Sequence, residues 1–138
     1  MLINVDLHGT LIDGSHDQWL QEKIQEGRPT EDHSSIWDDY SRMVFETRNS
    51  LTLNHRLFKL LYNLKEQGHA IRLWTNANYT LKRDIKHIIN TYSSLFDSYV
   101  FCAGKKKNQR VEGLVIDNES VNLQCGEQSI LVPTFNKM

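Results

Sequence analysis

The stretch "INVDLHGTLID", residues 3–13, places a carboxylate directly after a short apolar run and just before a turn. Residues 2–5 form a largely apolar segment of strand length, and Gly9-Thr10 favours a sharp turn. Asp6 would then lie at the carboxyl end of a buried strand, which is the edge where open α/β sheets bind ligands. A simple β-turn with a surface aspartate would explain the same residues. Residues elsewhere in the chain are needed to distinguish a ligand-binding loop from a simple surface turn.

The overall composition limits the kinds of partner. A chain of 138 residues suits one domain with a hydrophobic core. Its 16 basic and 17 acidic residues leave a formal charge of −1, which gives no general attraction to nucleic acid or to an anionic membrane. No stretch approaches the roughly 18 apolar residues of a membrane span, and the first residues lack the basic flank of a secretion signal. We therefore expect a soluble, cytoplasmic protein with no membrane partner.

The two cysteines, Cys102 and Cys125, show no metal-binding spacing. Two cysteines are enough for one disulfide, but nothing else in the sequence is typical of a secreted, disulfide-linked framework. We therefore expect two buried free thiols.

Helix and strand patterns alternate after residue 50, which is typical of a parallel sheet covered by helices. Leucines at helical spacing predict a helix over about 53–67, with Gly68 as its stop signal. "HAIRLWTNAN" (69–78) predicts a second strand that ends at Thr75 and Asn76. Apolar residues from Leu81 to Tyr92 predict another helix, and "SYVFCAG" (98–104), "GLVIDNES" (113–120) and "SILVPTF" (129–135) predict three further strands. The pattern therefore predicts an α/β fold with a mainly parallel, five-stranded sheet.

Residues 14–50 interrupt this alternation, since they contain no strand pattern. They hold two candidate helices, "HDQWLQEKIQEG" (16–27) and "SSIWDDYSRMVFETRN" (34–49), separated by the breaker-rich "GRPTED" (27–32). We interpret the segment as a small helical insertion within a single domain over 1–138. The connection between Lys107 and the fourth strand is too short for a full helix, so we expect a loop there.

Polar residues follow three of the predicted strands at their carboxyl ends. A parallel sheet would bring together Asp6, Thr75 with Asn76, and Asp117 with Asn118. Two carboxylates can hold Mg²⁺, a hard cation that prefers oxygen ligands, and one of them can also attack an electrophile. A hydroxyl and a lysine can hold the negative charge of a phosphoryl group. The set is that of a metal and phosphate site.

This combination resembles the haloacid dehalogenase superfamily, whose members are mostly Mg²⁺-dependent phosphatases that work through an aspartyl-phosphate intermediate. "VDLHGTLID" (5–13) is similar to the first motif, an apolar strand followed by Asp-x-Asp-x-Thr, with Asp6 in the nucleophile's position. "IRLWTNAN" (71–78) is similar to the second, in which Thr75 would hydrogen-bond the phosphoryl oxygens and Asn76 would also bind the phosphate. "VFCAGKKK" lies where the third motif places a lysine, and "LVIDNES" where the fourth places metal-binding acids. The resemblance covers most of the chain.

The resemblance implies a Rossmann-like three-layer sandwich with the sheet order third, second, first, fourth, fifth strand. It also implies Mg²⁺ bound by Asp6, the backbone carbonyl of His8 and Asp117. Lys105 follows Gly104 directly and is our first choice for the phosphate-binding, catalytic lysine. Lys106 is nearly as good a candidate, and Lys107 is a third. Asn118 or Glu119 would hold a metal-bound water, with an ordinary solvated loop acid as the simpler interpretation of Glu119.

The main departure from the family pattern is His8, which stands where the family has its acid/base aspartate. Imidazole gains and loses a proton near neutral pH, so His8 can act as acid in one half-reaction and as base in the other. The alternative is that the substitution marks a weakened or lost activity. We take the active interpretation because a dead site would have little need of Asp6, Thr75, a lysine and Asp117 together.

The insertion lies where the family places its cap. Its aromatic residues, Trp19, Trp37, Tyr40 and Phe45, are predicted to pack rather than to contact substrate. His16 and His33 lie in the same segment and can approach the site, whereas His55, His69 and His87 read as surface or capping residues. Such a small cover would admit a nucleotide as well as a small metabolite.

Together these features predict a Mg²⁺-dependent phosphomonoesterase with Asp6, His8, Thr75 and Lys105 as its catalytic residues. Its expected ligand is a phosphorylated small molecule or nucleotide; a nucleic-acid end would fit but is not indicated. The competing class is a weak or inactive binding module that recognises a phosphorylated ligand or a protein partner.

Overall fold

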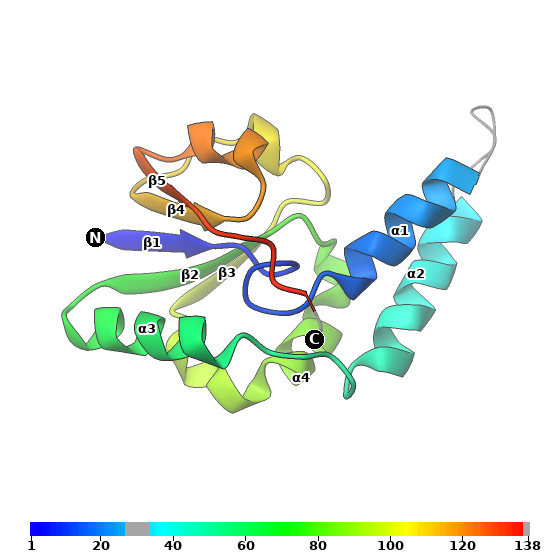
Figure 1. The fold of residues 1–138 in the computed structure, drawn as a ribbon, viewed down its shortest axis with the longest axis horizontal. Helices are drawn as coiled ribbons and strands as arrows, with labels where there is room; N and C mark the ends of the chain where they lie inside the picture. The colour runs from blue at the N-terminus through cyan, green and yellow to red at the C-terminus, as the bar shows by residue number, and fades with distance from the viewer. Residues whose placement is uncertain (27–33, 137–138) are drawn as a thin grey trace.

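The computed structural model describes residues 1–26 and 34–136, which form a five-stranded sheet and its flanking helices (Figure 1). The strands are β1 (Leu2–Val5), β2 (Ala70–Thr75), β3 (Ser98–Phe101), β4 (Leu114–Asp117) and β5 (Gln128–Leu131). Their order is β3-β2-β1-β4-β5, and every neighbouring pair is parallel. The predicted fold class and strand order are therefore confirmed. Because β1 is central, Asp6 emerges in the middle of the carboxyl edge.

One face of the sheet is covered by α3 (His55–Glu66) and α4 (Lys82–Ile88), which bury the larger hydrophobic core. Asn54 caps α3, since its side chain accepts a hydrogen bond from the backbone N–H of Leu57. The predicted helix over 81–92 is divided: α4 is flanked by the 3₁₀ segments η1 (Tyr79–Leu81) and η2 (Asn90–Leu95). Tyr92 has non-helical backbone angles, so the apolar spacing continues further than the helix does.

The other face has a thinner cover, made of the 3₁₀ segments η3 (Lys106–Asn108) and η4 (Ser120–Cys125). A small second core lies beneath them, and it contains Trp74, Val115 and both cysteines. Cys102 and Cys125 are buried and free, as predicted. The connections on this face are too short for α-helices, which agrees with the loop expected after Lys107.

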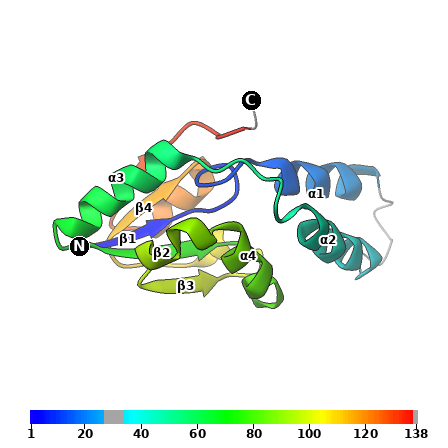
Figure 2. The same ribbon diagram turned by 90° about the horizontal axis from the view of Figure 1, so that it is seen from below.

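Between β1 and α3 the chain forms α1 (Ser15–Glu26) and α2 (Ser34–Thr47), which pack against each other. This helical pair extends past the arrowheads of the strands and lies apart from α3 and α4 (Figures 1 and 2). Tyr40 and Val44 anchor it to the main core, whereas Trp37 and Phe45 are exposed. The predicted break "GRPTED" and His33 lie outside the described residues. Within 1–26 and 34–136, no helix is long and apolar enough to cross a membrane.

Candidate active site

The loop after β1 holds Asp6 in a fixed orientation. The backbone N–H of Asp6 still pairs with Ile116 of β4, and the Thr10 hydroxyl donates to Asp6 Oδ2 at 2.8 Å. The turn closes through Gly9, whose φ is +79°. The positive φ requires glycine, and a Cβ added there would lie 2.6 Å from the end of the Asn118 side chain and displace it. The sequence signal Gly9-Thr10 therefore serves to aim Asp6.

Lys106 bridges the two carboxylates. Its Nζ lies 2.8 Å from Asp6 Oδ1 and 2.6 Å from Asp117 Oδ2, and the side chain is fully buried. The ammonium also lies 4.2 Å from the centre of the Trp74 ring, a cation–π distance. Two acids and one lysine thus form a buried ionic cluster between the ends of β1 and β4.

The structure places Lys106, and not Lys105, against the two carboxylates. Lys105, the first choice from the sequence, is exposed and makes no ion pair with these carboxylates, whereas Lys106 lies between them. The reason is the backbone: Ala103 and Gly104 adopt φ angles of 48° and 79°, which turn the chain after β3. The Asn76 side chain then accepts a hydrogen bond from the Lys106 N–H at 2.9 Å and fixes the turn. Asn76 therefore positions the lysine, a role that the sequence did not indicate.

Asp117 is completely buried, and both of its carboxylate oxygens have polar partners. Besides Lys106, Oδ2 accepts from the Asn122 amide at 3.1 Å, and Oδ1 accepts from the Glu119 N–H at 2.9 Å. Burial, together with the neighbouring Asp6 carboxylate, raises the pKa of Asp117, and the Lys106 ammonium acts in the opposite direction. Asn122, which the sequence analysis missed, completes the shell of this carboxylate.

The inner end of the Asn118 amide lies 2.9 Å from Asp6 Oδ2 and 3.3 Å from Asp117 Oδ1. With its NH₂ inward, the amide donates to both carboxylates and accepts from the Thr134 hydroxyl; with its oxygen inward, it donates to Thr134 instead. In the second orientation the amide oxygen of Asn118 converges with Asp6 Oδ2 and Asp117 Oδ1, and no N–H lies between these three oxygens. Neighbouring ligands of an octahedral Mg²⁺ are themselves about 2.9 Å apart.

This donor set fits a hard divalent cation. Within the part of the chain that the structure describes, no group of three or more His, Cys, Asp or Glu side chains is arranged to hold a metal ion by itself. The site offers carboxylate and amide oxygens instead, which Mg²⁺ prefers. Asp6 and Asn118 face the common point most closely, while Asp117 is partly committed to Lys106. The sequence analysis gave Asn118 only an indirect role through water; with its oxygen inward, the amide would be placed for a direct one.

Thr75, at the end of β2, is buried beside the same edge. Its hydroxyl oxygen accepts a hydrogen bond from the Ala77 N–H at 3.2 Å. Its own proton is therefore available to an acceptor in the cleft.

His8 lies at the boundary between the sheet and the helical pair, and its side chain is nearly buried, with 7% exposed. Its Nδ1 lies 3.9 Å from a carboxylate oxygen of Asp17, which is on α1. The ring of His16 lies on its other flank, with 5.5 Å between ring centres. Asp17 was missed by the sequence analysis, while His16 approaches the site as expected.

The hydrogen bonds of His16 fix its tautomer. The Thr47 hydroxyl donates to the Met43 carbonyl at 2.7 Å, so its oxygen accepts from His16 Nε2 at 2.8 Å. This leaves Nδ1 as a bare, buried lone pair without a protein partner. Burial, and to a smaller extent His8, lowers the pKa of His16 to about 4, so the ring is neutral at pH 7.

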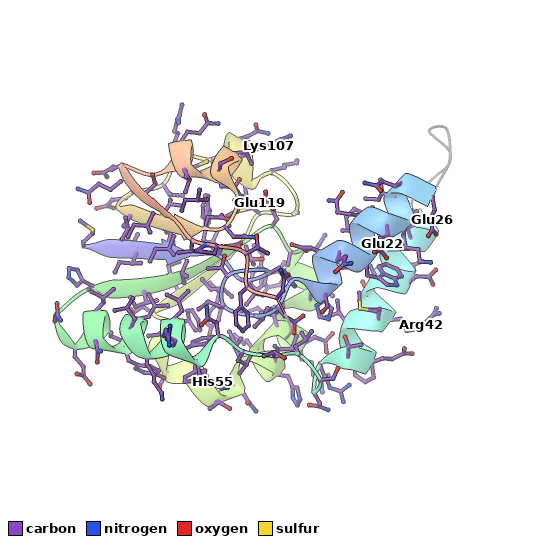
Figure 3. The ribbon with its side chains drawn as sticks, in the orientation of Figure 1. Glu22, Glu26, Arg42, His55, Lys107 and Glu119 are labelled. Carbon is purple, nitrogen blue, oxygen red and sulfur yellow. The ribbon has the colours of Figure 1, made fainter. Side chains whose placement is uncertain are left out.

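A cleft of about 790 Å³ is lined at its base by Asp6, His8, Thr75 and Asn118, and Lys106 and Asp117 are buried behind Asp6; we call these six residues the floor. Its far wall is the helical pair, and its near wall consists of the segments that follow β2, β3 and β4. Figure 3 shows Lys107 and Glu119 on these near segments, apart from Glu22 and Glu26 of α1. The same view places His55 at the start of α3, where its ring bonds the Tyr92 hydroxyl. The cleft is large enough for a drug-sized ligand.

Comparison with known proteins supports the fold. The sequence matches no protein-family model and no curated protein. Its structure is similar to a HAD-superfamily hydrolase from Ehrlichia chaffeensis (TM-score 0.54, 18% identity, 96% of this chain and 86% of that one). It is also similar to a HAD-family enzyme from Bacteroides thetaiotaomicron, solved in complex with magnesium and inorganic phosphate (TM-score 0.57, 13% identity, 99% and 96% of the two chains). The chain therefore has a HAD-like fold.

Proposed function

We propose that the chain is a Mg²⁺-dependent phosphohydrolase in which Asp6 is the nucleophile and His8 the acid/base group. The observation that carries the proposal is the buried cluster of Lys106 with Asp6 and Asp117 at the floor of the cleft. A buried ion pair is usually no more stabilising than an apolar contact, so stability alone does not explain it. A buried acid whose pKa is raised, as that of Asp117 is, is a common mark of catalytic sites.

The neighbour that binds magnesium and phosphate supports the kind of ligand. In this chain the oxygens of Asp6, Asn118 and Asp117, with the His8 carbonyl, would hold the ion. When bound, Mg²⁺ supplies positive charge that lessens the repulsion between a carboxylate nucleophile and the phosphoryl oxygens. Localisation in the cytoplasm remains a prediction from the sequence.

Each residue on the floor then has a defined task. Lys106 and Thr10 each hold one oxygen of Asp6, which orients the carboxylate without protonating it. One of these oxygens forms a bond to phosphorus as the bond from phosphorus to the ester oxygen breaks. The Thr75 hydroxyl and the Lys106 ammonium stabilise the phosphoryl oxygens.

His8 handles the protons. In the first step it donates a proton to the departing alkoxide, and in the second it takes one from the water that attacks the aspartyl phosphate. The carboxylate of Asp17 faces His8 Nδ1, and this leaves the other ring nitrogen for substrate. The products are the alcohol, inorganic phosphate and the regenerated Asp6 carboxylate.

The test is phosphate release from a panel of phosphomonoesters, including p-nitrophenyl phosphate, with Mg²⁺ or with EDTA. Wild type should release phosphate only with Mg²⁺, and Asp6→Asn should release almost none. The Asp39→Asn variant, which changes an exposed acid on α2, should behave as wild type. Phosphate binding without any release by wild type would instead favour the binding-module alternative.

A further inference from the structure

Positive charge is concentrated in one stretch of the chain. Residues 76–111 hold seven Lys or Arg and two Asp or Glu, a formal charge of +5, whereas the whole chain carries −1. One of the seven, Lys106, is buried between the carboxylates of the floor, and the other six are partly or fully exposed. The balanced overall charge therefore conceals a basic region.

The acids near this region weaken it little. Asp97 pairs with Lys65 at 3.2 Å, and Asp84 is half-buried. The helical pair on the other side of the cleft, in contrast, carries three acids and one base on each of its helices, α1 and α2. A polyanion is therefore repelled by the helical pair and attracted to the segments after β2 and β3.

The basic region folds around β3, an edge strand of the sheet. Lys86 on α4 lies over the ring of Tyr99 on β3, with 4.7 Å from Nζ to the ring centre. One turn earlier, Lys82 lies over Tyr79 at 5.0 Å, and the Tyr79 ring meets Phe101 edge to face at 5.8 Å. Figure 2 shows α4 beside β3. Cations and aromatic rings thus alternate on a surface that we call the basic edge: Tyr79, Lys82, Lys86, Tyr99, Phe101 and Lys105.

The basic edge begins at the rim of the cleft. Tyr79 lies between Asn78 and Thr80, which both line the cleft, and it is itself 64% exposed. It is four residues beyond Thr75, so the two Cα atoms are at most about 14 Å apart. The Asn78 side chain accepts a hydrogen bond from the Thr80 N–H at 3.0 Å, which fixes the turn that carries Tyr79. A chain that leaves the floor on this side therefore passes over Tyr79 first.

Alternating rings and cations suit a single-stranded nucleic acid. Each nucleotide brings a base that can stack on an aromatic ring and a phosphate that can pair with an ammonium. An anionic membrane would attract the same cations, but it offers no flat rings to stack on Tyr79. The observations therefore favour a nucleic acid over a membrane.

We propose that the basic edge binds single-stranded nucleic acid and directs its terminal phosphate to the floor. The proposal rests on the proposed phosphohydrolase function and names its substrate class. The terminal phosphate would lie at Asp6, and the neighbouring nucleotides over Tyr79 and Lys86. Water is consumed, the bond from phosphorus to the terminal ester oxygen breaks, and the products are a strand with a free hydroxyl and inorganic phosphate.

The first experiment measures binding of a fluorescent oligothymidylate without a terminal phosphate, so that only the surface is tested. Wild type should bind it, with an affinity that falls as salt rises. Lys86→Gln should weaken binding and reduce the slope of log Kd against log salt by about 0.7, the value for one phosphate contact on a single strand. Tyr79→Ala should weaken binding about fivefold or more, whereas Tyr79→Phe should bind as wild type because it keeps the ring.

Matched variants elsewhere are the controls. Lys59→Gln changes an exposed lysine on α3, and Phe45→Ala removes a 52% exposed ring that also has a cation, Arg48, over it. Both should bind as wild type. The proposal is overturned if wild type does not bind, if variants and controls lose affinity equally, or if phosphatidylserine vesicles bind in preference to the oligonucleotide.

The second experiment compares the hydrolysis of oligothymidylate phosphorylated at its 5′ or 3′ end with that of thymidine monophosphate phosphorylated at the same position. For the end that is cleaved, kcat/KM should be roughly tenfold higher for the oligonucleotide, mainly through KM, because the added contacts are remote from the reacting bond. Tyr79→Ala should remove most of this ratio, and Phe45→Ala should leave it unchanged. Equal kcat/KM for the oligonucleotide and the mononucleotide would overturn the substrate class.

p-Nitrophenyl phosphate separates the two proposals. Its hydrolysis by wild type without any preference for oligonucleotides overturns the substrate class and leaves the phosphohydrolase function standing. No hydrolysis of it or of any phosphorylated oligonucleotide overturns the function, and with it the delivery of a terminal phosphate, while the binding experiment still decides on the surface.

Discussion

The floor of the cleft is made of buried side chains held at hydrogen-bond distance, whereas the helical pair above it offers partly exposed side chains with few polar partners. On the floor, Lys106 contacts two acids within 2.8 Å. On the helical pair, Trp37 and Ile24 face open space. Under the proposed function, the sheet edge would carry out the chemistry and the helical pair would cover the cleft. Changes on the floor should therefore cost far more than changes on the helices.

Lys106→Met should have the largest effect on the folded state. It leaves Asp6 and Asp117 buried close together without their shared cation, so we expect the free energy of unfolding to fall by about 3–5 kcal/mol, with loss of turnover. Lys105→Met changes an exposed side chain and should shift stability by no more than about 0.5 kcal/mol. Urea unfolding of both variants measures this; similar losses would contradict the placement of Lys106.

His8→Ala should slow the hydrolysis of alkyl phosphates by roughly 10²–10⁴-fold, the usual contribution of general acid–base catalysis. p-Nitrophenyl phosphate needs little protonation of its leaving group, so its first turnover, measured as the burst of p-nitrophenol, should slow much less. Mg²⁺ affinity should change little, because only the backbone carbonyl of His8 is assigned to the metal. An equal slowing of the first-turnover release of both alcohols would show that His8 is not the acid.

Between the two regions, His16 should make stability depend on pH. Its folded-state pKa of about 4 lies below the ordinary 6.5, so the unfolded chain binds a proton at a pH where the folded protein does not. Its contribution is complete above pH 6.5 and is lost as pH falls toward 4, by up to about 3 kcal/mol. The stability difference between wild type and His16→Gln should therefore narrow over that range. A constant difference would mean that His16 is not buried as a neutral ring.

The sheet and its edge were predictable because the signal is local. Each strand is an apolar run, and the position after its last residue is known from the sequence, so Asp6, Thr75 and Asp117 could be brought together without coordinates. Which of Lys105 and Lys106 reaches the carboxylates depends on a single left-handed turn at Ala103 and Gly104. An alanine in the sequence does not indicate a positive φ, so this turn could not be predicted.

The helical pair was predictable only as helices. That α1 faces the cleft with Asp17 and Ile24 depends on its rotation about its own axis, and that rotation is set by packing against α2 and Tyr40 rather than by its own residues. Asn118 and Thr134 meet because the chain after β5 returns across the loop at Gly9. Contacts of this kind have no local signal.

The most direct test of the account is to find where phosphate is bonded during turnover. His8→Ala protein mixed with p-nitrophenyl phosphate and Mg²⁺, then quenched in acid, should carry phosphate on the peptide that contains Asp6, because loss of the base slows hydrolysis of the aspartyl phosphate. The double variant with Asp6→Asn should carry none. Phosphate on another residue, or undiminished turnover by Asp6→Asn, would contradict the central claim that Asp6 is the nucleophile.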